Sequence, residues 1–149
     1  MAKYAVRMQR TASTTLSVGN ITADATRPRR GKIYDIMFGS EATPADNVFL
    51  WQLQRCTTAG TATGVTPQAL DPDDAATEAD AAEIHTVDPT LTAGAMLLTI
   101  PLNQRASYRW VAAPGGELVY PATASNGIAV RTPTSTAVVV TATTHFDEQ

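Results

Sequence analysis

The sequence predicts an all-β protein, a single-domain β-sandwich or jelly roll over residues 1–149 with one long acidic loop. Thr and Ala number 23 and 25, and the branched Cβ of Thr favours the pleated surface of a strand. Residues that favour long helices are scarce, with only 2 Lys and 5 Glu. Short apolar segments meet turn residues every 10–15 residues or so, a spacing typical of a sandwich of roughly eight strands.

The first half of the chain is expected to hold four strands, separated by turns rich in Pro and Gly. They are expected over residues 3–9, 16–21, 32–38 and 48–56. In the fourth strand Phe49, Trp51 and Leu53 share one apolar face with Arg55, so this face is expected to be the core. Residues 1–12 are also expected to act as an N-terminal arm.

Residues 57–89 show no sustained period of two and are expected to form the long acidic loop. The segment holds seven of the 14 acidic residues and neither Lys nor Arg. One short helix over 72–83 is considered within it, because Asp71, Asp73 and Asp74 suit a helix N-terminus. A loop of this length in a small domain is usually functional or mobile.

The second half is expected to hold five more strands. They are expected over residues 95–102, 105–112, 117–122, 127–133 and 136–146. In the strand over 105–112, Tyr108 and Trp110 point one way and Arg105 and Arg109 point the other. A core position for the two aromatic residues is favoured over a sugar-binding one.

The sequence does not predict an enzyme, a metal site or a cofactor site. His85 and His145 are the two histidines, and neither belongs to a recognisable catalytic motif. The lone Cys56 at a strand end is expected to be a buried small hydrophobe. The acidic run at 71–74 lacks the glycine of a calcium-binding loop, and a solvated loop is favoured over a calcium site or a pair of hydrolase carboxylates.

Charge and hydropathy limit the partners. The net charge is −3, which does not favour nucleic acid as a partner of the whole chain. No stretch approaches about 18 consecutive apolar residues, so no membrane span is expected, and the first residues do not predict a secretory leader.

The charges are distributed unevenly along the chain. Residues 1–32 hold seven basic residues against the single acid Asp24, while 57–89 is purely acidic. Two interpretations stay open: the two regions neighbour each other within one molecule, or they pair between copies or with a partner.

Several motifs resemble those of a known family. They are the run Arg55, Thr57, Thr58, Ala59, Gly60 and Thr61, the V-T-P-x-x-L-D-P segment from Val65 to Pro72, Arg105 with Trp110, and the ending Phe146, Asp147 and Glu148. Over about two thirds of its length the chain is similar to the capsid decoration, or cement, proteins encoded among the head genes of tailed bacteriophages.

The resemblance implies a non-enzymatic β-sandwich or jelly roll on the capsid exterior of the virion. Its expected partners are the major capsid protein and further copies of itself, as a dimer or trimer. The residues expected at the capsid or subunit interface are Arg7, Arg10, Arg27, Arg29 and Arg30. The alternative is a carbohydrate-binding or host-attachment module of a head fibre or tail, motivated by Trp51, Tyr108, Trp110 and the segment 57–89.

Overall fold

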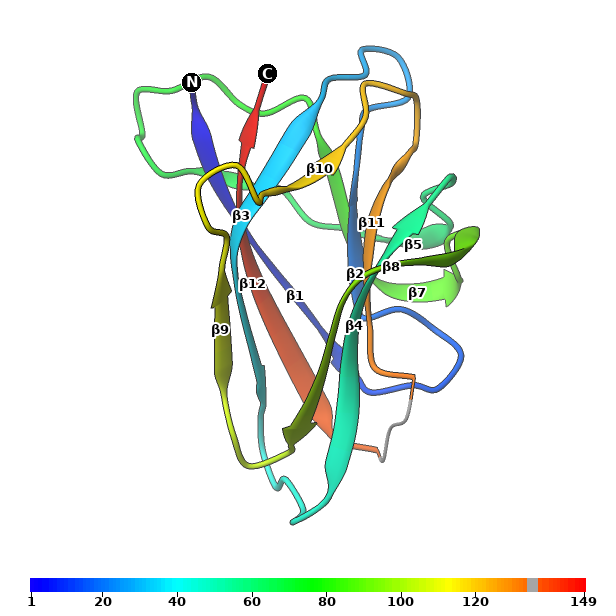
Figure 1. Ribbon diagram of the computed structural model, residues 1–149. Helices are drawn as coiled ribbons and strands as arrows, with labels where there is room; N and C mark the ends of the chain where they lie inside the picture. The colour runs from blue at the N-terminus through cyan, green and yellow to red at the C-terminus, as the bar shows by residue number, and fades with distance from the viewer. Residues whose placement is uncertain (134–136) are drawn as a thin grey trace.

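The computed structural model describes residues 1–133 and 137–149, which form twelve strands and no helix (Figure 1). Six strands belong to the first sheet: β1 (Lys3–Thr11), β3 (Gly31–Ser40), β6 (Gln68–Ala69), β9 (Tyr108–Val111), β10 (Leu118–Tyr120) and β12 (Val139–Glu148). Six belong to the second sheet: β2 (Gly19–Thr22), β4 (Val48–Cys56), β5 (Thr61–Gly64), β7 (Asp80–Val87), β8 (Leu91–Asn103) and β11 (Gly127–Arg131).

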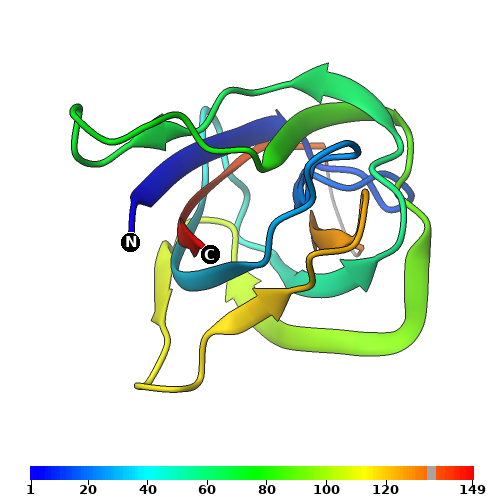
Figure 2. The same ribbon diagram turned by 90° about the horizontal axis from the view of Figure 1, so that it is seen from above.

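The two sheets pack against each other, and all their strand pairs are antiparallel. The first sheet has the order β10-β3-β12-β1-β6. β9 pairs with the second part of β3, after the residues of β3 that pair with β10. The second has the order β5-β7-β2-β11-β4-β8. Figure 2 shows the arrangement of the strands from above. The predicted β-sandwich is confirmed, and a jelly-roll arrangement is compatible with it.

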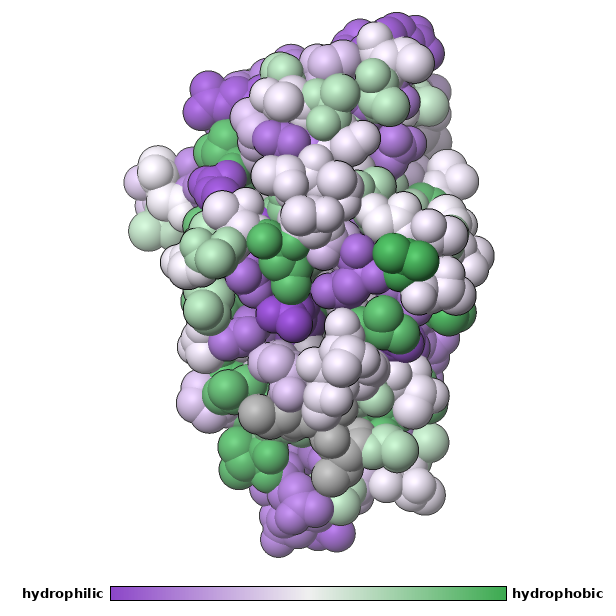
Figure 3. Space-filling view, turned by 90° about the vertical axis from the view of Figure 1, so that its right-hand side faces the viewer, coloured by the Kyte–Doolittle hydropathy of each residue, from purple (hydrophilic) through white to green (hydrophobic). Residues whose placement is uncertain are grey.

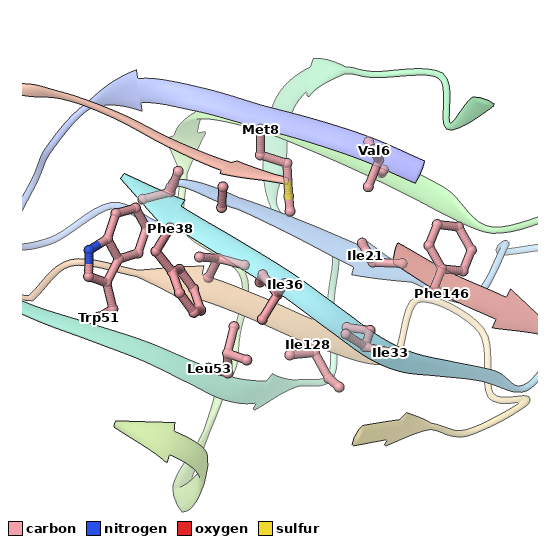
Figure 4. Packing of buried hydrophobic residues seen from close by; sticks show 14 of the residues in the cluster. Val6, Met8, Ile21, Ile33, Ile36, Phe38, Trp51, Leu53, Ile128 and Phe146 are labelled. Atoms are coloured by element: carbon pink, nitrogen blue, oxygen red, sulfur yellow. The ribbon is translucent and has the colours of Figure 1, made fainter. Parts of the chain in front are cut away.

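The core is formed where the apolar faces of the two sheets meet (Figure 4). Trp51 on β4 is 1% exposed, and its ring centroid lies 4.9 Å from that of Phe38 and 5.7 Å from that of Phe49. The strand predicted over 48–56 is confirmed with the same bounds, and its Phe49, Trp51 and Leu53 are all buried. Alternation along the strand accounts for this face, since every second side chain points into the sandwich.

Residues Lys3–Thr11 form a full strand of the first sheet, so the expected N-terminal arm is wrong for this segment. β1 pairs with β12 at nine successive positions and with β6 on its other side. Tyr4, Val6 and Met8 are at most 3% exposed, because their alternation matches the inner face of the sheet. The strand predicted over 3–9 is therefore the part of the expectation that is confirmed.

The segment 57–89 is not one continuous loop, and the helix considered over 72–83 is wrong. It contains β5, β6 and β7, and 70–79 is the longest stretch in it that remains irregular. The hydroxyl of Tyr4 donates to the Ala75 carbonyl, and Glu148 accepts from the Glu78 amide, which ties this stretch to the first sheet. β7 shows no period of two because its register with β5 shifts, and Ile84 there has a φ of 54°.

The strands of the second half follow the prediction with shifted ends. β8 is longer than the expected 95–102, while β9, β10 and β11 are shorter than their predicted ranges. β12 runs from 139 to 148, and position 136 of its predicted range lies outside the described residues. The core prediction is wrong for Tyr108, which is 43% exposed, whereas Trp110 is half-buried against the core. Both residues lie on β9 at the edge of the first sheet, where the second sheet covers them incompletely.

Gly60 allows a close approach between the loop after β4 and the end of β7. Its φ is +72°, and a Cβ atom there would lie 2.4 Å from the Val87 carbonyl oxygen. We expect Gly60→Ala to cost at least about 2 kcal/mol, because it combines a left-handed backbone with a steric clash. Urea denaturation of the purified variant measures this loss.

Gly64→Ala is the matched control, since a Cβ atom at Gly64 in β5 meets nothing within 4 Å. Alanine is better than glycine in a strand, so this variant is expected to be neutral or more stable by up to about 1 kcal/mol. Equal losses at positions 60 and 64 would contradict the packing of the 57–60 loop.

Candidate functional site

The loop between β2 and β3 is shaped by the carboxylate of Asp24. Its Oδ1 accepts hydrogen bonds from the Thr26 hydroxyl at 2.7 Å, from the Thr26 amide at 2.8 Å and from the Arg27 amide at 2.5 Å. The Thr26 hydroxyl, with these amides, lowers the pKa of Asp24 to about 2. The turn holds the following arginines at the end of the sandwich where both chain termini lie (Figure 1).

Arg30 and Arg55 line a hollow at this end of the molecule. The hollow, here called the basic hollow, is lined by Arg30, Arg55, Val119, Pro121 and Ala122. Arg30 precedes β3 and is exposed, and the backbone N–H of Gln149 donates to the Arg30 carbonyl oxygen at 2.8 Å. Arg55 is half-buried near the end of β4, and its Nη1 donates to the Val119 carbonyl oxygen of β10 at 2.6 Å. The basic hollow therefore takes residues from both sheets.

The guanidinium groups at this end are well suited to bind an oxyanion. Within residues 1–133 and 137–149, no carboxylate lies within 4.0 Å of the side-chain nitrogens of Arg29, Arg30 or Arg55. A guanidinium presents several N–H donors in a planar fork that matches a carboxylate or a phosphate. The apolar walls formed by Val119 and Pro121 strengthen such a contact by excluding water from one side.

The five arginines expected at an interface do not form one patch. Arg30 is exposed and lines the basic hollow, and Arg29 is exposed one residue before it in the chain. Arg27 pairs with Glu78 at 2.9 Å. Arg7 lies on the outer face of β1 and donates to the Gln9 side chain. Arg10 donates to the carbonyl oxygens of Ser17 and His85, and burial lowers the pKa of its guanidinium.

Arg55 is a member of this site that sequence reasoning assigned to a strand face and to the motif run Arg55–Thr61, but not to an interface. Its alternation with Trp51 and Leu53 placed it on the core side of β4. In the structure Arg55 is half-buried, and its long side chain reaches across to the Val119 carbonyl oxygen of β10. A charged residue at the end of an apolar alternation was the signal that could have identified it.

The basic N-terminal region and the acidic segment neighbour each other within one molecule. Glu83 Oε2 accepts from the Gln9 amide at 2.7 Å, and Asp88 Oδ1 accepts from the Ser17 amide at 2.6 Å. The Arg27–Glu78 ion pair joins the same two regions. The intramolecular interpretation of the charge asymmetry is thus observed. The side chains of Asp71, Asp73 and Asp74 have no ion pair in the described residues.

His85 and Cys56, which were considered for catalysis, are both buried. His85 is 1% exposed, its Nε2 lies 3.3 Å from the Ala59 carbonyl, and burial lowers its pKa. Cys56 is buried as expected, and burial raises the pKa of its thiol to about 12, which disfavours the reactive thiolate. In the described part of the chain no group of three or more His, Cys, Asp or Glu side chains is arranged to hold a metal ion.

The aromatic residues considered for carbohydrate binding do not form one surface. Trp51 is enclosed between Phe38 and Phe49 and cannot stack on a sugar. Tyr108 is the exposed member of the set, and Trp110 is half-buried. Only the β9 edge therefore presents an aromatic ring of this set to solvent.

A buried carboxylate connects three strands on the outer face of the first sheet. Asp35 on β3 accepts two hydrogen bonds from Arg109 of β9, at 2.9 and 2.6 Å. Its Oδ2 also lies 3.0 Å from Nδ1 of His145 on β12. The Arg109 guanidinium is the main reason that the pKa of Asp35 lies below its ordinary value. Asp35 thus engages both Arg109 and His145, so this cluster stabilises the sheet.

Comparisons with known proteins add no identification: no family model, no curated protein and no solved structure matches the chain. The described residues include no helix that is long and apolar enough to cross a lipid bilayer.

Asp35→Asn is expected to lower the free energy of unfolding at pH 7 by about 2 kcal/mol, since it removes a charged acceptor from Arg109 and His145. The lowered pKa means that ionised Asp35 stabilises the folded state above its unfolded pKa, and that this stabilisation is lost as the pH falls through the lower folded pKa. The difference between variant and wild type should therefore shrink below pH 4, where urea denaturation at successive pH values follows it.

Asp73→Asn is the control for this experiment, because Asp73 is exposed and has no ion pair in the described residues. It should leave stability within about 0.5 kcal/mol of wild type. A constant difference between Asp35→Asn and wild type down to pH 2 would refute the role assigned to the ionised carboxylate.

Proposed function

We propose that this protein is a non-enzymatic decoration protein that binds the outside of an assembled phage capsid. It bridges neighbouring major capsid subunits and stabilises the shell. The observation that carries the proposal is the set of guanidinium groups of Arg29, Arg30 and Arg55, which have no carboxylate partner in the described residues. Such groups favour an acidic surface on another protein as their partner.

The basic hollow also connects the proposal to the motif resemblance. Arg55 begins the run Arg55–Thr61, which resembles the capsid decoration proteins, and the same side chain lines the hollow. Gly60 in this run lets the following loop pack against the end of β7. The resembling residues therefore support both the fold and the proposed contact.

The stabilising effect needs no catalytic step. A protein that binds the assembled shell but not its separated subunits shifts the equilibrium toward the shell by mass action. In the proposed contact, Arg29 and Arg30 pair with carboxylates of the major capsid protein, and the half-buried Arg55 orients one of them. Many symmetric copies on one particle add avidity to individually weak contacts.

Carbohydrate binding is the second candidate function, and the exposure of Tyr108 is the observation that favours it. An exposed aromatic ring on a sheet edge offers an apolar face on which a sugar ring can stack. The enclosed position of Trp51 removes the largest aromatic residue from that role, so the capsid proposal takes precedence.

The proposal is tested by co-sedimentation of the purified protein with bare shells of its phage, both expanded shells and unexpanded precursors. We expect saturable binding to expanded shells, with the double variant Arg29→Glu, Arg30→Glu binding at least tenfold more weakly. Shells carrying the wild-type protein should also retain DNA at a higher temperature than bare shells.

Arg105→Glu is the matched control, because Arg105 is an exposed arginine in the turn between β8 and β9, at the opposite end of the sandwich (Figure 1). It makes the same change in charge without touching the basic hollow. Absence of binding to either kind of shell would overturn the capsid proposal, and a glycan array would then test the second candidate. Equal weakening by both charge reversals would remove the basic end from the contact.

A further inference from the structure

The free edges of the two sheets differ greatly in length. The first sheet ends at β6, with two residues, and at β9 and β10, with four and three residues. The second sheet ends at β5, with four residues, and at β8, with 13 residues. Short edge strands protect a sheet against pairing with other chains, because few backbone groups are left unpaired. In the described part of the chain, β8 alone lacks this protection.

The composition of β8 also leaves its edge open. The strand reads LTAGAMLLTIPLN, without one Lys, Arg, Asp or Glu, although charged side chains commonly guard an edge. None of its 13 residues is buried, and Met96 is 49% exposed. The segment Ala95–Ile100, here called the edge window, lies between Gly94, whose φ is 70°, and Pro101. A short segment of this kind, apolar, uncharged and free of proline, readily accepts another strand.

One side of the edge window is already occupied, and the other is not. β8 pairs with β4 without a break from Val48↔Asn103 to Leu53↔Leu98, and after a register shift Met96 pairs with Gln54. No strand of the described residues pairs with the other side of β8. Figure 2 shows β8 along the periphery of the sandwich. Backbone N–H and C=O groups on the outer side of an edge strand face solvent unless another strand pairs with them.

We propose that the edge window pairs antiparallel with the edge window of a second copy, so that the two second sheets join into one continuous sheet. A second copy fits because antiparallel pairing of identical strands has a two-fold axis, and each copy then presents the same backbone pattern to the other. The absence of charge means that self-pairing sets no like charges opposite each other. The contact uses up both edges, so the assembly closes at a dimer.

The broad face of the second sheet is less suited to this role than its edge. Figure 3 shows the side of the molecule on which this sheet lies, with hydrophobic side chains scattered as separate spots among hydrophilic ones. Single exposed apolar residues are normal on a protein surface and do not define an interface. Pairing along β8 needs no continuous apolar patch, because the backbone N–H and C=O groups of the strand make the contact.

Charge variants at Thr99 test the proposal, because Thr99 is an exposed residue of the edge window. Sedimentation equilibrium of the full chain from about 1 µM to about 100 µM should show a monomer–dimer equilibrium for the wild type. Thr99→Lys and Thr99→Asp should each weaken the dimer at least tenfold, since each sets two like charges on the same face of the joined sheet, diagonally across the axis. An equimolar mixture of the two variants should restore dimers, because the opposite charges then meet.

Thr63→Lys and Thr63→Asp are the matched controls, since Thr63 is exposed on the short edge strand β5. They should dimerise like the wild type. Amide hydrogen exchange gives a second measurement, in which protection of residues 95–100 should rise with concentration in the wild type but not in Thr99→Lys.

Three results would overturn the proposal. They are a wild type that stays monomeric throughout, a dimer that responds equally to charges at positions 63 and 99, and growth beyond the dimer. The measurements need no capsid, so they are independent of the shell-binding experiment.

Discussion

The burial of alternating side chains between two sheets is the constraint on which the rest of the structure depends. Tyr4, Val6 and Met8 on β1 and Trp51 on β4 belong to one buried core, and their burial does not permit a shift of register in either strand. Because side chains alternate, a slip by one residue would turn each apolar face toward solvent. The same alternation determines which residues are left outside, and the outward positions of β1, β3 and β12 carry the polar clusters. The surface chemistry is thus a consequence of the packing of the core.

Alternation also explains where the fold could be predicted. The strand over 48–56 alternates with period two from Phe49 to Leu53, and the structure confirms its predicted bounds. In 57–89 the strands contain many small and acidic residues. β7 is held by backbone pairing to β2, β5 by pairing to β7, and β6 by pairing to β1. Carboxylates such as that of Glu83 also accept hydrogen bonds from main-chain amides. A register shift interrupts β7 as well. Neither a side-chain acceptor from a distant segment nor a bulge leaves a periodic pattern, so this region was predicted as a loop.

The candidate site, too, could be predicted from the sequence only in part. The exposed arginines at 29 and 30 follow from a polar, proline-containing loop, which sequence reasoning identifies well. Whether an arginine is free or engaged depends on contacts that are remote in the sequence. Arg10 is engaged by carbonyl groups of Ser17 and His85, whereas Arg55 crosses to the other sheet. A guanidinium binds whichever carbonyl or carboxylate the fold brings near it, so residue type alone does not distinguish a binding surface from an internal contact.

A protein that bridges other subunits needs more than one contact surface, and the sandwich offers two of different physical kinds. The basic hollow lies at the end of the molecule, and its side chains favour an acidic partner through charge, a contact that salt weakens. The edge window runs along one side of the second sheet, and its backbone groups favour an identical strand through hydrogen bonds, which salt affects little. A dimer formed through β8 would leave both basic hollows unoccupied, because none of their lining residues belongs to β8. Each dimer would then carry two of the ends proposed to bind the shell, and two ends on one particle would add avidity.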